Sequence, residues 1–187
     1  MGLRLPVFVS SGGQQSNQTL NFFNYDAPLI YSLTPVTYAT DGNVVLTISG
    51  YSLGSAGTVT VGSSLCTQAG TGTSWVDSTI LCLLPPGQGN NLVVQVTAGS
   101  QLSNTTLFSY NPPSISAVVP ANGATTGGYV ITLFGSSFGL SAVTTFVSTQ
   151  TGAINVCSPV GIGQTHSVRR TPQQLVALSL RACQTLC

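Results

Sequence analysis

The sequence predicts an all-β protein built from two small β-sandwiches, and two observations lead to this prediction. Short runs of alternating apolar and polar residues are bounded by Gly, Pro or Ser, with turn signals about every 8 to 12 residues, as in a sandwich. In addition, residues 7–19 match residues 94–106 at seven of thirteen positions, at an offset of 87. A repeat of that length is a domain, so we expect two domains in 187 residues.

The repeat continues after a two-residue slip, now at an offset of 85. Three landmarks recur in it, which are Phe23, Tyr25 and Pro28 in the first copy and Phe108, Tyr110 and Pro113 in the second. Each copy reads as a strand, a polar turn and a second strand, because Val94 and Val96 alternate with polar residues before the turn near Gly99. An isolated hairpin is at best marginally stable in water, so we expect the first copy to pack against something else.

A set of spaced residues between 27 and 111 carries a family resemblance. Its members are Pro28, Ile30, Pro35, Gly42, residues 46–50, Gly54, Cys66, residues 80–82, Pro85, Gly87, Gly89, Phe108 and Tyr110. This set resembles the IPT/TIG immunoglobulin-like domain over the whole of residues 27–111. The resemblance implies an immunoglobulin-like sandwich in which Cys66 and Cys82 are the family's recurrent cysteine pair. A disulfide between them would stabilise the domain by roughly 3 kcal/mol.

The same elements begin again at an offset of 85. They are Pro113, Ile115, Pro120, residues 127–128, residues 131–135 and residues 138–139. Beyond Leu140 the resemblance fades: Thr151 stands at the position of Cys66, and Cys157 follows six residues later. Residues 174–178 are expected to replace the strand at 80–82, which places Ala177 at the position of the second cysteine.

These repeats predict tandem IPT/TIG sandwiches, one complete and one split between the two chain ends. Residues 1–27 are expected to be the last two strands of a repeat. Residues 28–111 form the complete domain, and residues 112–187 an incomplete domain that lacks its last two strands. Residues 1–27 and 112–187 would together make one complete repeat.

Five cysteines in a Gly-, Pro- and Thr-rich β sequence indicate an oxidising setting, extracellular or at the cell surface. Buried thiols in an intracellular protein are the alternative for Cys66 and Cys82. Of the other three, we prefer a pair between Cys157 and Cys183. That pairing leaves Cys187 free, paired across subunits, or paired with a residue beyond Cys187.

Charge is scarce in this chain. Only 4% of residues are charged, against about a quarter in ordinary domains, and there is no Lys and no Glu. Surface polarity must come from other residues, and the obvious source is the 47 Ser and Thr residues with Asn and Gln beside them, to which covalent glycans would add. Sequons at Asn17 and Asn104 recur at one position of the repeat, which predicts N-glycans at both. The near-neutral charge argues against nucleic acid as a partner, and no apolar stretch is long enough for a membrane span.

No catalytic or metal site is expected, and no cofactor. His166 lies beside Arg169 and Arg170 but has no acid or nucleophile near it in the sequence, so we interpret the cluster as a solvated loop, with the anchoring of a glycan or a neighbouring subunit as the alternative. The three Asp residues are too dispersed for a calcium loop, and the cysteines lack the spacing of a zinc site. An enzyme is therefore not expected.

Three functions remain: the split repeat is compatible with the first two, and the absence of Lys favours the first. It is a structural subunit of an extracellular filament, which polymerises head to tail when the N-terminal hairpin enters the incomplete sandwich of the next copy. The donor side chains would be Leu5, Val7, Val9, Phe23 and Tyr25. The connection at residues 26–28 spans only about 10 Å, too short to fold back over the complete domain. Exposed sheet edges are usually guarded by charge, often Lys, and edges filled by a partner need no guard, so the absence of Lys favours the filament.

The second function is that of a fragment of a long cell-surface adhesion or receptor-like protein with many such repeats. There, the missing strands would lie in residues outside this chain. The third is an accessory domain of an enzyme or a transcription factor, which the lack of a catalytic constellation and of a basic loop makes the weakest of the three.

Overall fold

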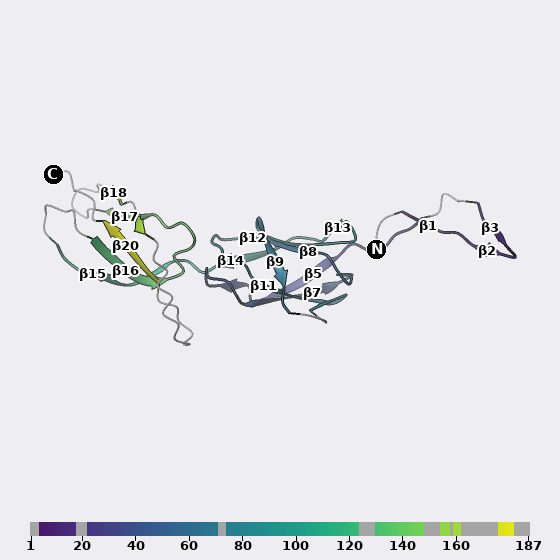
Figure 1. The fold of residues 1–187 in the computed structure, drawn as a ribbon, viewed down its shortest axis with the longest axis horizontal. Coiled ribbons are helices and arrows are strands. Elements are labelled where there is room, and N and C mark those ends of the chain that lie inside the picture. The colour runs from purple at the N-terminus through teal and green to yellow at the C-terminus, as the bar shows by residue number, and fades with distance from the viewer. Residues whose placement is uncertain are drawn as a thin grey trace. The chain divides into compact units, whose positions relative to one another are not determined.

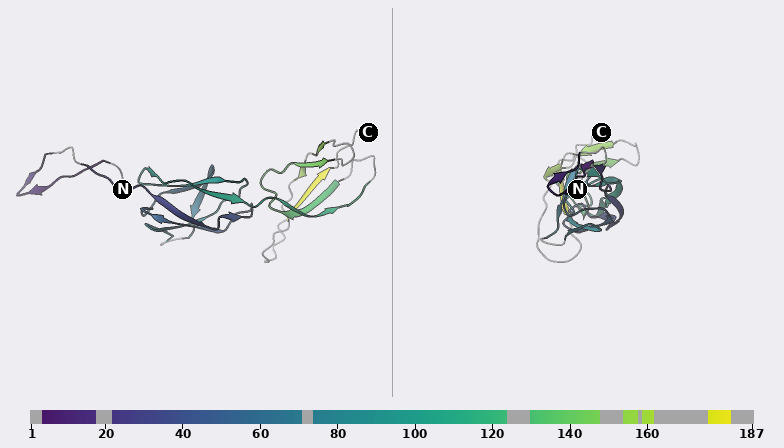
Figure 2. Two further views of the ribbon diagram at one scale, coloured as in Figure 1. Left: turned by 180° about the vertical axis from the view of Figure 1, so that it is seen from behind. Right: turned by 90° about the vertical axis from the view of Figure 1, so that its right-hand side faces the viewer.

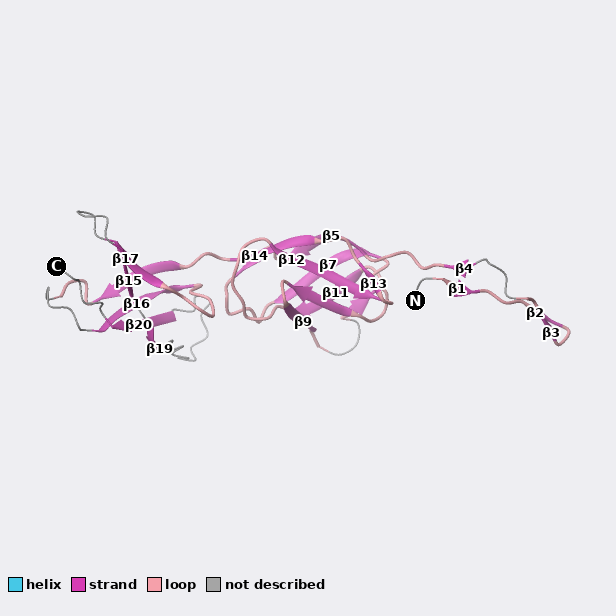
Figure 3. Cartoon of the chain, turned by 90° about the horizontal axis from the view of Figure 1, so that it is seen from above, coloured by secondary structure: helices cyan, strands magenta, loops and turns pink. Residues whose placement is uncertain are grey.

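The computed structural model describes residues 4–17, 22–70, 74–123, 130–147, 154–157, 159–161 and 176–181, and all regular elements in these ranges are strands (Figures 1 and 3). The chain divides into two compact units. Unit 1 comprises residues 1–38 and 42–109, and unit 2 comprises residues 39–41 and 110–187.

The N-terminal part of unit 1 is a ribbon of four short strands that pair only with one another in the described ranges. We call residues 4–17 and 22–25 the N-terminal hairpin. β1 (Leu5–Pro6) pairs with β4 (Phe22–Phe23), and β2 (Ser10–Ser11) pairs with β3 (Gln14–Gln15), all antiparallel.

The remainder of unit 1 is a curled ten-stranded sheet, which Figure 2 shows from behind as two layers. Its principal order is β5-β7-β11-β9-β8-β12-β14-β6, with β10 beside β11 and β13 beside β12. The strands are β5 (Leu29–Thr34), β6 (Thr37–Tyr38), β7 (Val45–Tyr51), β8 (Thr58–Val61), β9 (Ser64–Gln68), β10 (Trp75–Val76), β11 (Thr79–Leu83), β12 (Leu92–Ala98), β13 (Gln101–Leu102) and β14 (Thr106–Tyr110).

The core of this sheet follows from the alternation of its sequence. Every second residue of a strand points to the same face, so apolar residues at alternate positions of β7, β11, β12 and β14 meet between the layers. The least exposed of them are Leu46, Ile48, Ile80, Val94, Val96 and Phe108. The indole of Trp75 closes one end, where its Nε1 donates a hydrogen bond to the carbonyl of Leu53 (3.0 Å). The predicted all-β, immunoglobulin-like character of this part is confirmed.

Unit 2 contains a four-stranded sheet of order β15-β16-β20-β19 and a separate pair, β17-β18. Its strands are β15 (Ser114–Val119), β16 (Val130–Ser136), β17 (Thr144–Val147), β18 (Ile154–Cys157), β19 (Pro159–Gly161) and β20 (Val176–Arg181). The pairing of β15 with β16 has the register of β5 with β7, shifted by 85 residues. Ile115 lies opposite Gly135 as Ile30 lies opposite Gly50, and a bulge follows at the same place in each pair.

The register of β20 corrects one expectation from the sequence. Leu180, rather than Ala177, takes the position of Cys82, because Leu180 lies opposite Ile131 as Cys82 lies opposite Leu46. Ala177 is three residues earlier in the ladder. The preceding segment differs in length between the two units, so projecting positions by a constant offset misplaces this strand.

The position of Cys157 is also set by strand register. Cys157 lies opposite Thr144 in the β17-β18 pair, as Cys66 lies opposite Val59 in the β8-β9 pair. Cys157 comes six residues later than an offset of 85 from Cys66 would place it, so the six additional residues of unit 2 lie before β18. Cys183 and Cys187 lie outside the described residues, so the preferred pair of Cys157 with Cys183 stays a prediction.

Candidate assembly site

The N-terminal hairpin has the strand register of β12, β13 and β14. Leu5 pairs with Phe23 as Leu92 pairs with Phe108, the same partners at offsets of 87 and 85. At the turn, Ser10 and Ser11 pair with Gln15 and Gln14, and Thr97 and Ala98 pair in the same order with Leu102 and Gln101. The two segments therefore share their register at both pairs of strands that the structure describes in the hairpin.

The turns also share their hydrogen bonds. The N–H of Ser16 donates to the carbonyl of Val9 (2.8 Å), and the N–H of Val9 donates to Oγ of Ser16 (3.1 Å). Ser103 and Val96 make the same two bonds, at 2.8 and 2.9 Å. Gly12 and Gly13 take left-handed φ angles of 60° and 79°, as Gly99 and Ser100 do at 56° and 65°. The hairpin thus reaches the conformation of its buried counterpart from local interactions.

The open end of the hairpin matches as well. Arg4 has a φ of 57°, and its N–H donates to Oδ1 of Asn24 (2.6 Å). At the corresponding place Asn91 has a φ of 54°, and its N–H donates to Oγ of Ser109 (2.9 Å). The guanidinium of Arg4 also lies over the ring of Phe22, 4.7 Å from its centroid, so this end of the ribbon has a cation–π contact of its own.

Burial is where the two segments differ. Val7, Val9 and Phe23 are 51%, 67% and 51% exposed, whereas Val94, Val96 and Phe108 are at most 1% exposed. Leu5 and Tyr25 are also exposed. Burying a side chain of this size contributes about 1.5–3 kcal/mol, so these five residues represent several kcal/mol of unrealised stabilisation. The candidate donor residues are therefore exposed where their counterparts in the middle domain are buried or half-buried.

Unit 2 exposes residues that are buried at the same register positions of unit 1. Ile115 and Val118 on β15 are 59% and 38% exposed, while Ile30 and Leu33 on β5 are 4% and 6% exposed. On the adjacent strand β16, Ile131 and Leu133 are buried. Two apolar side chains of β16 are therefore buried, whereas those of Ile115 and Val118 on the neighbouring strand β15 are exposed.

Asn104 has a structural role that sequence reasoning missed. Its Oδ1 accepts a hydrogen bond from the N–H of Ile30 (2.6 Å), and its Nδ2 donates to the carbonyl of Ile30 (3.0 Å). The amide therefore satisfies both backbone groups of one β5 residue, 74 positions away in the sequence. This pair of hydrogen bonds gives Asn104 a structural role that does not depend on a glycan. The recurrence of asparagine at positions 17 and 104 is visible in the sequence, but it does not indicate Ile30 as the partner, and an asparagine in a sequon is first interpreted as a modification site.

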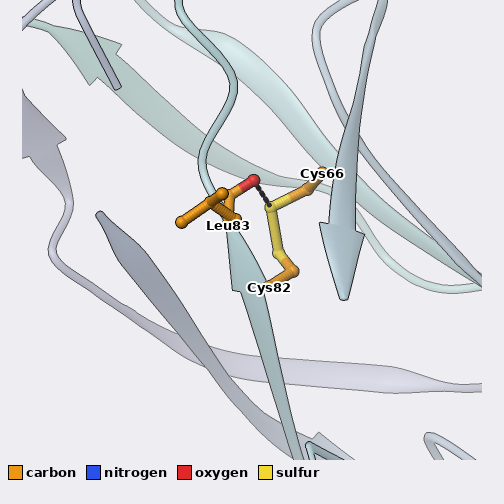
Figure 4. The surroundings of a disulfide bond; sticks show 3 residues. All are labelled: Cys66, Cys82 and Leu83. Atoms are coloured by element: carbon orange, nitrogen blue, oxygen red, sulfur yellow. Dashed lines mark hydrogen bonds between the residues drawn. A yellow bond between two sulfur atoms is a disulfide. The ribbon is translucent and has the colours of Figure 1, made fainter. Parts of the chain in front are cut away.

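The predicted disulfide between Cys66 and Cys82 is present (Figure 4). The two Cα atoms are 5.6 Å apart, and the bond joins β9 to β11, where one layer of the sheet passes into the other. The sulfur of Cys66 lies 3.3 Å from the carbonyl oxygen of Leu83. Both cysteines are buried, at 7% and 1% exposure, so the bond is sealed within the core.

The other predicted positions are placed as follows. Asn17 is exposed, and its glycosylation and that of Asn104 stay predictions. Asp77 is bound into a loop, where its Oδ1 accepts from the N–H of Gly54 (3.0 Å). His166, Arg169 and Arg170 lie outside the described residues.

The described ranges contain neither a metal-binding cluster nor a membrane-spanning helix. Within those ranges, no three His, Cys, Asp or Glu residues gather where they could hold a metal ion. The same part of the chain contains no helix long and apolar enough to cross a membrane.

Comparison with known proteins identifies the middle of the chain. Residues 28–110 match the model of the IPT/TIG domain, which confirms the family predicted for this part. Among solved structures, the chain is similar to two of the plexin A4 full extracellular region, each at 18% identity with a TM-score of 0.42. The similar regions cover 92% and 91% of this chain but only 14% and 18% of the plexin chains.

We expect the double variant Cys66→Ala/Cys82→Ala to lower the unfolding free energy of unit 1 by about 3 kcal/mol, because the unfolded chain loses its cross-link. Trp75 is the chain's single tryptophan and is buried in this unit, so its fluorescence during urea unfolding reports the effect. Cys157→Ala, in unit 2, is the matched control and should leave this transition unchanged. An unaltered urea midpoint in the double variant would contradict a stabilising disulfide.

In protein made without glycans, we expect Asn104→Ala to lower the same unfolding free energy by about 1–3 kcal/mol. The reason is that the N–H and carbonyl of Ile30 lose their partners. Thr106→Ala removes the sequon but keeps the Asn104 amide, so it should cost less. Equal losses in the two variants, again followed by Trp75 fluorescence, would show that the amide contact contributes nothing specific.

Proposed function

Starting from residues 28–110 as an IPT/TIG domain of immunoglobulin-like fold, we propose that this chain is a structural, non-enzymatic subunit of an extracellular filament. In this proposal the N-terminal hairpin of one copy completes unit 2 of the next. Unit 2 is then a second domain of the same kind that lacks its own last two strands. The partner is another copy of the chain.

One observation carries the proposal. The hairpin has the strand register of β12 and β14, but the apolar side chains that are buried in those strands are exposed in the hairpin. Side chains that form the sandwich core in one copy of the repeat are exposed in the other, on a backbone of the same register. Apolar residues exposed in such numbers mark an interaction surface. Because the hairpin repeats the strands β12 and β14, its apolar side chains would fit the core of another sandwich of the same family.

Unit 2 supports the role of acceptor. Its described strands include counterparts of β5, β7, β8, β9 and β11, but none of β12 or β14. Ile115 and Val118 on β15 are exposed where Ile30 and Leu33 of unit 1 are buried, and this is the pattern expected of a sandwich that lacks part of its opposing layer. Adding the missing strands would cover this face with main-chain hydrogen bonds and matching side chains, the mode known as strand addition.

Assembly of this kind continues without limit unless a ring closes. The donor and acceptor are different surfaces of one chain, so each added copy offers a new acceptor and the contact is heterologous. The disulfide supports an extracellular setting, where such bonds persist. Covalent glycans would supply the solubility that a chain with 4% charged residues lacks.

We expect Val7→Asp/Val9→Asp to abolish assembly of the full-length chain without unfolding it. Both side chains are exposed in the free chain, and each would place a charge in the apolar core of the acceptor. Tyr31→Asp/Leu65→Asp adds the same charge at equally exposed residues of the middle domain and should assemble normally. Sedimentation and electron microscopy over a concentration series give the readout.

Deletion of residues 1–25 tests the same proposal from the other side. The truncated chain should fail to polymerise but should cap the growing ends of full-length filaments, since it keeps the acceptor. Filaments from the truncated chain would refute the mechanism, as would a full-length chain that stays monomeric at high concentration. Either result would favour the stacked-repeat cell-surface protein instead.

A further inference from the structure

We propose that the hairpin adds to one particular edge of the next copy, the edge of β17 that faces away from β18, in a single register. In that register Val7 lies opposite Phe146 and Val9 opposite Thr144, and the amide of Asn17 binds the backbone of Ile115. The inference rests on the proposed function and specifies its interface.

The complete domain provides the template. There, β8 lies between two antiparallel neighbours, β9 on one edge and β12 on the other. On the β12 side, Val94 pairs with Val61 and Val96 with Val59. These four valines are buried, at 3% exposure or less, so this seam is part of the core.

β17 is the counterpart of β8 by its register with the next strand. Thr144 lies opposite Cys157 as Val59 lies opposite Cys66. In the described residues β17 pairs with β18 alone, so the edge that β12 fills in unit 1 has no strand on it here. A bare edge of unpaired N–H and C=O groups is the surface to which a further strand adds.

The repeat offsets convert this template into residue pairs. Each residue of the donor strand is numbered 87 lower than its counterpart in β12, and each residue of β17 is numbered 85 higher than its counterpart in β8. The pair of Gln95 with Thr60 in unit 1 therefore corresponds to Phe8 of one copy with Thr145 of the next. By the same rule, the pair of Thr97 with Thr58 becomes Ser10 with Val143. A slip of one residue would turn Val7 and Val9 away from the core, and the alternation therefore specifies one register.

Asn17 supplies a second, polar determinant of that register. In unit 1 the amide of Asn104 binds the N–H and carbonyl of Ile30, the residue opposite Gly50. Ile115 holds the same ladder position, opposite Gly135, and Asn17 holds the position of Asn104 in the hairpin. The amide of Asn17 in one copy is thus matched to the backbone of Ile115 in the next, on the strand whose apolar side chains are uncovered.

Cross-linking between two single variants of the full-length chain tests the register. One chain carries Phe8→Cys and the other Thr145→Cys, so a disulfide between the new cysteines must join different molecules. The chains are mixed under assembly conditions with glutathione disulfide as oxidant, and mass spectrometry of peptides identifies the link. Phe8→Cys mixed with Val143→Cys is the control, because residues two positions out of register have Cα atoms about 7–8 Å apart, beyond disulfide reach.

The outcomes separate this inference from the proposed function. Filaments in which residues 8 and 145 are linked, with little linkage of 8 to 143, support the register. Filaments that form without this link, or with residue 8 linked elsewhere, overturn the register and leave strand addition standing. Failure of the unmodified chain to assemble at all overturns both.

The polar determinant is tested separately. Asn17→Ala should raise the critical concentration for assembly about tenfold, the loss expected for two hydrogen bonds of roughly 0.7 kcal/mol each. Thr19→Ala removes the sequon and keeps the amide, so it should assemble as the unmodified chain does. If both variants assemble equally well, the Asn17 contact is excluded. If both are impaired equally, the glycan rather than the amide is responsible.

Discussion

The structure depends on the burial of one strand pair, β12 with β14, against the rest of the sandwich. Val94, Val96 and Phe108 supply the apolar side of this contact, and the pairing of β12 with β8 supplies the backbone side. A strand buried in a sheet needs partners for its N–H and C=O groups and a cover for its apolar face. In the middle domain both needs are met within one chain. In the described residues of the N-terminal hairpin the strands pair only with one another, β1 with β4 and β2 with β3, and the side chains of Val7, Val9 and Phe23 are exposed.

This contrast shows which properties of a hairpin are local and which depend on its partner. The turn at Gly12 and Gly13, the bonds between Ser16 and Val9, and the bond from Arg4 to Asn24 form between residues of the hairpin itself. Side-chain burial requires the opposing layer. A hairpin held in its final conformation before docking loses less conformational entropy when it binds, so preorganisation of this kind favours association.

Two further contacts reinforce the sandwich beside its strand pairing. The disulfide joins β9 to β11 at the passage between layers, and the Asn104 amide holds the outer strand β5 at Ile30. In the assembly we propose, the Asn104 contact has a counterpart in Asn17, but the disulfide has none. Leu180 occupies the position of Cys82 in unit 2, so Cys157 must find another partner or remain a thiol. Closure of the proposed joint then depends on strand pairing, apolar burial and the asparagine contact.

Much of the middle domain could be predicted from the sequence, because alternating apolar residues and turn glycines are local features. The hairpin was recognisable for the same reason, and its repeat of residues 94–106 indicated what it copies. The prediction that Ala177 takes the position of Cys82 was wrong. The segment before β20 differs in length from its counterpart in unit 1, and the alternation of a short strand does not reveal such a change. The contact of Asn104 with Ile30 could not be predicted, because it joins residues 74 positions apart and an amide in a sequon has another explanation.

Hydrogen–deuterium exchange of the full-length chain, measured in dilute and in concentrated solution, tests the central claim most directly. The account predicts that amides of residues 5–11 and 22–25 exchange quickly in the dilute chain and become protected on assembly, together with those of residues 143–147. Amides of the middle domain should be protected in both states. Filaments in which the hairpin still exchanges quickly would show that it is not the donor, and would contradict the account.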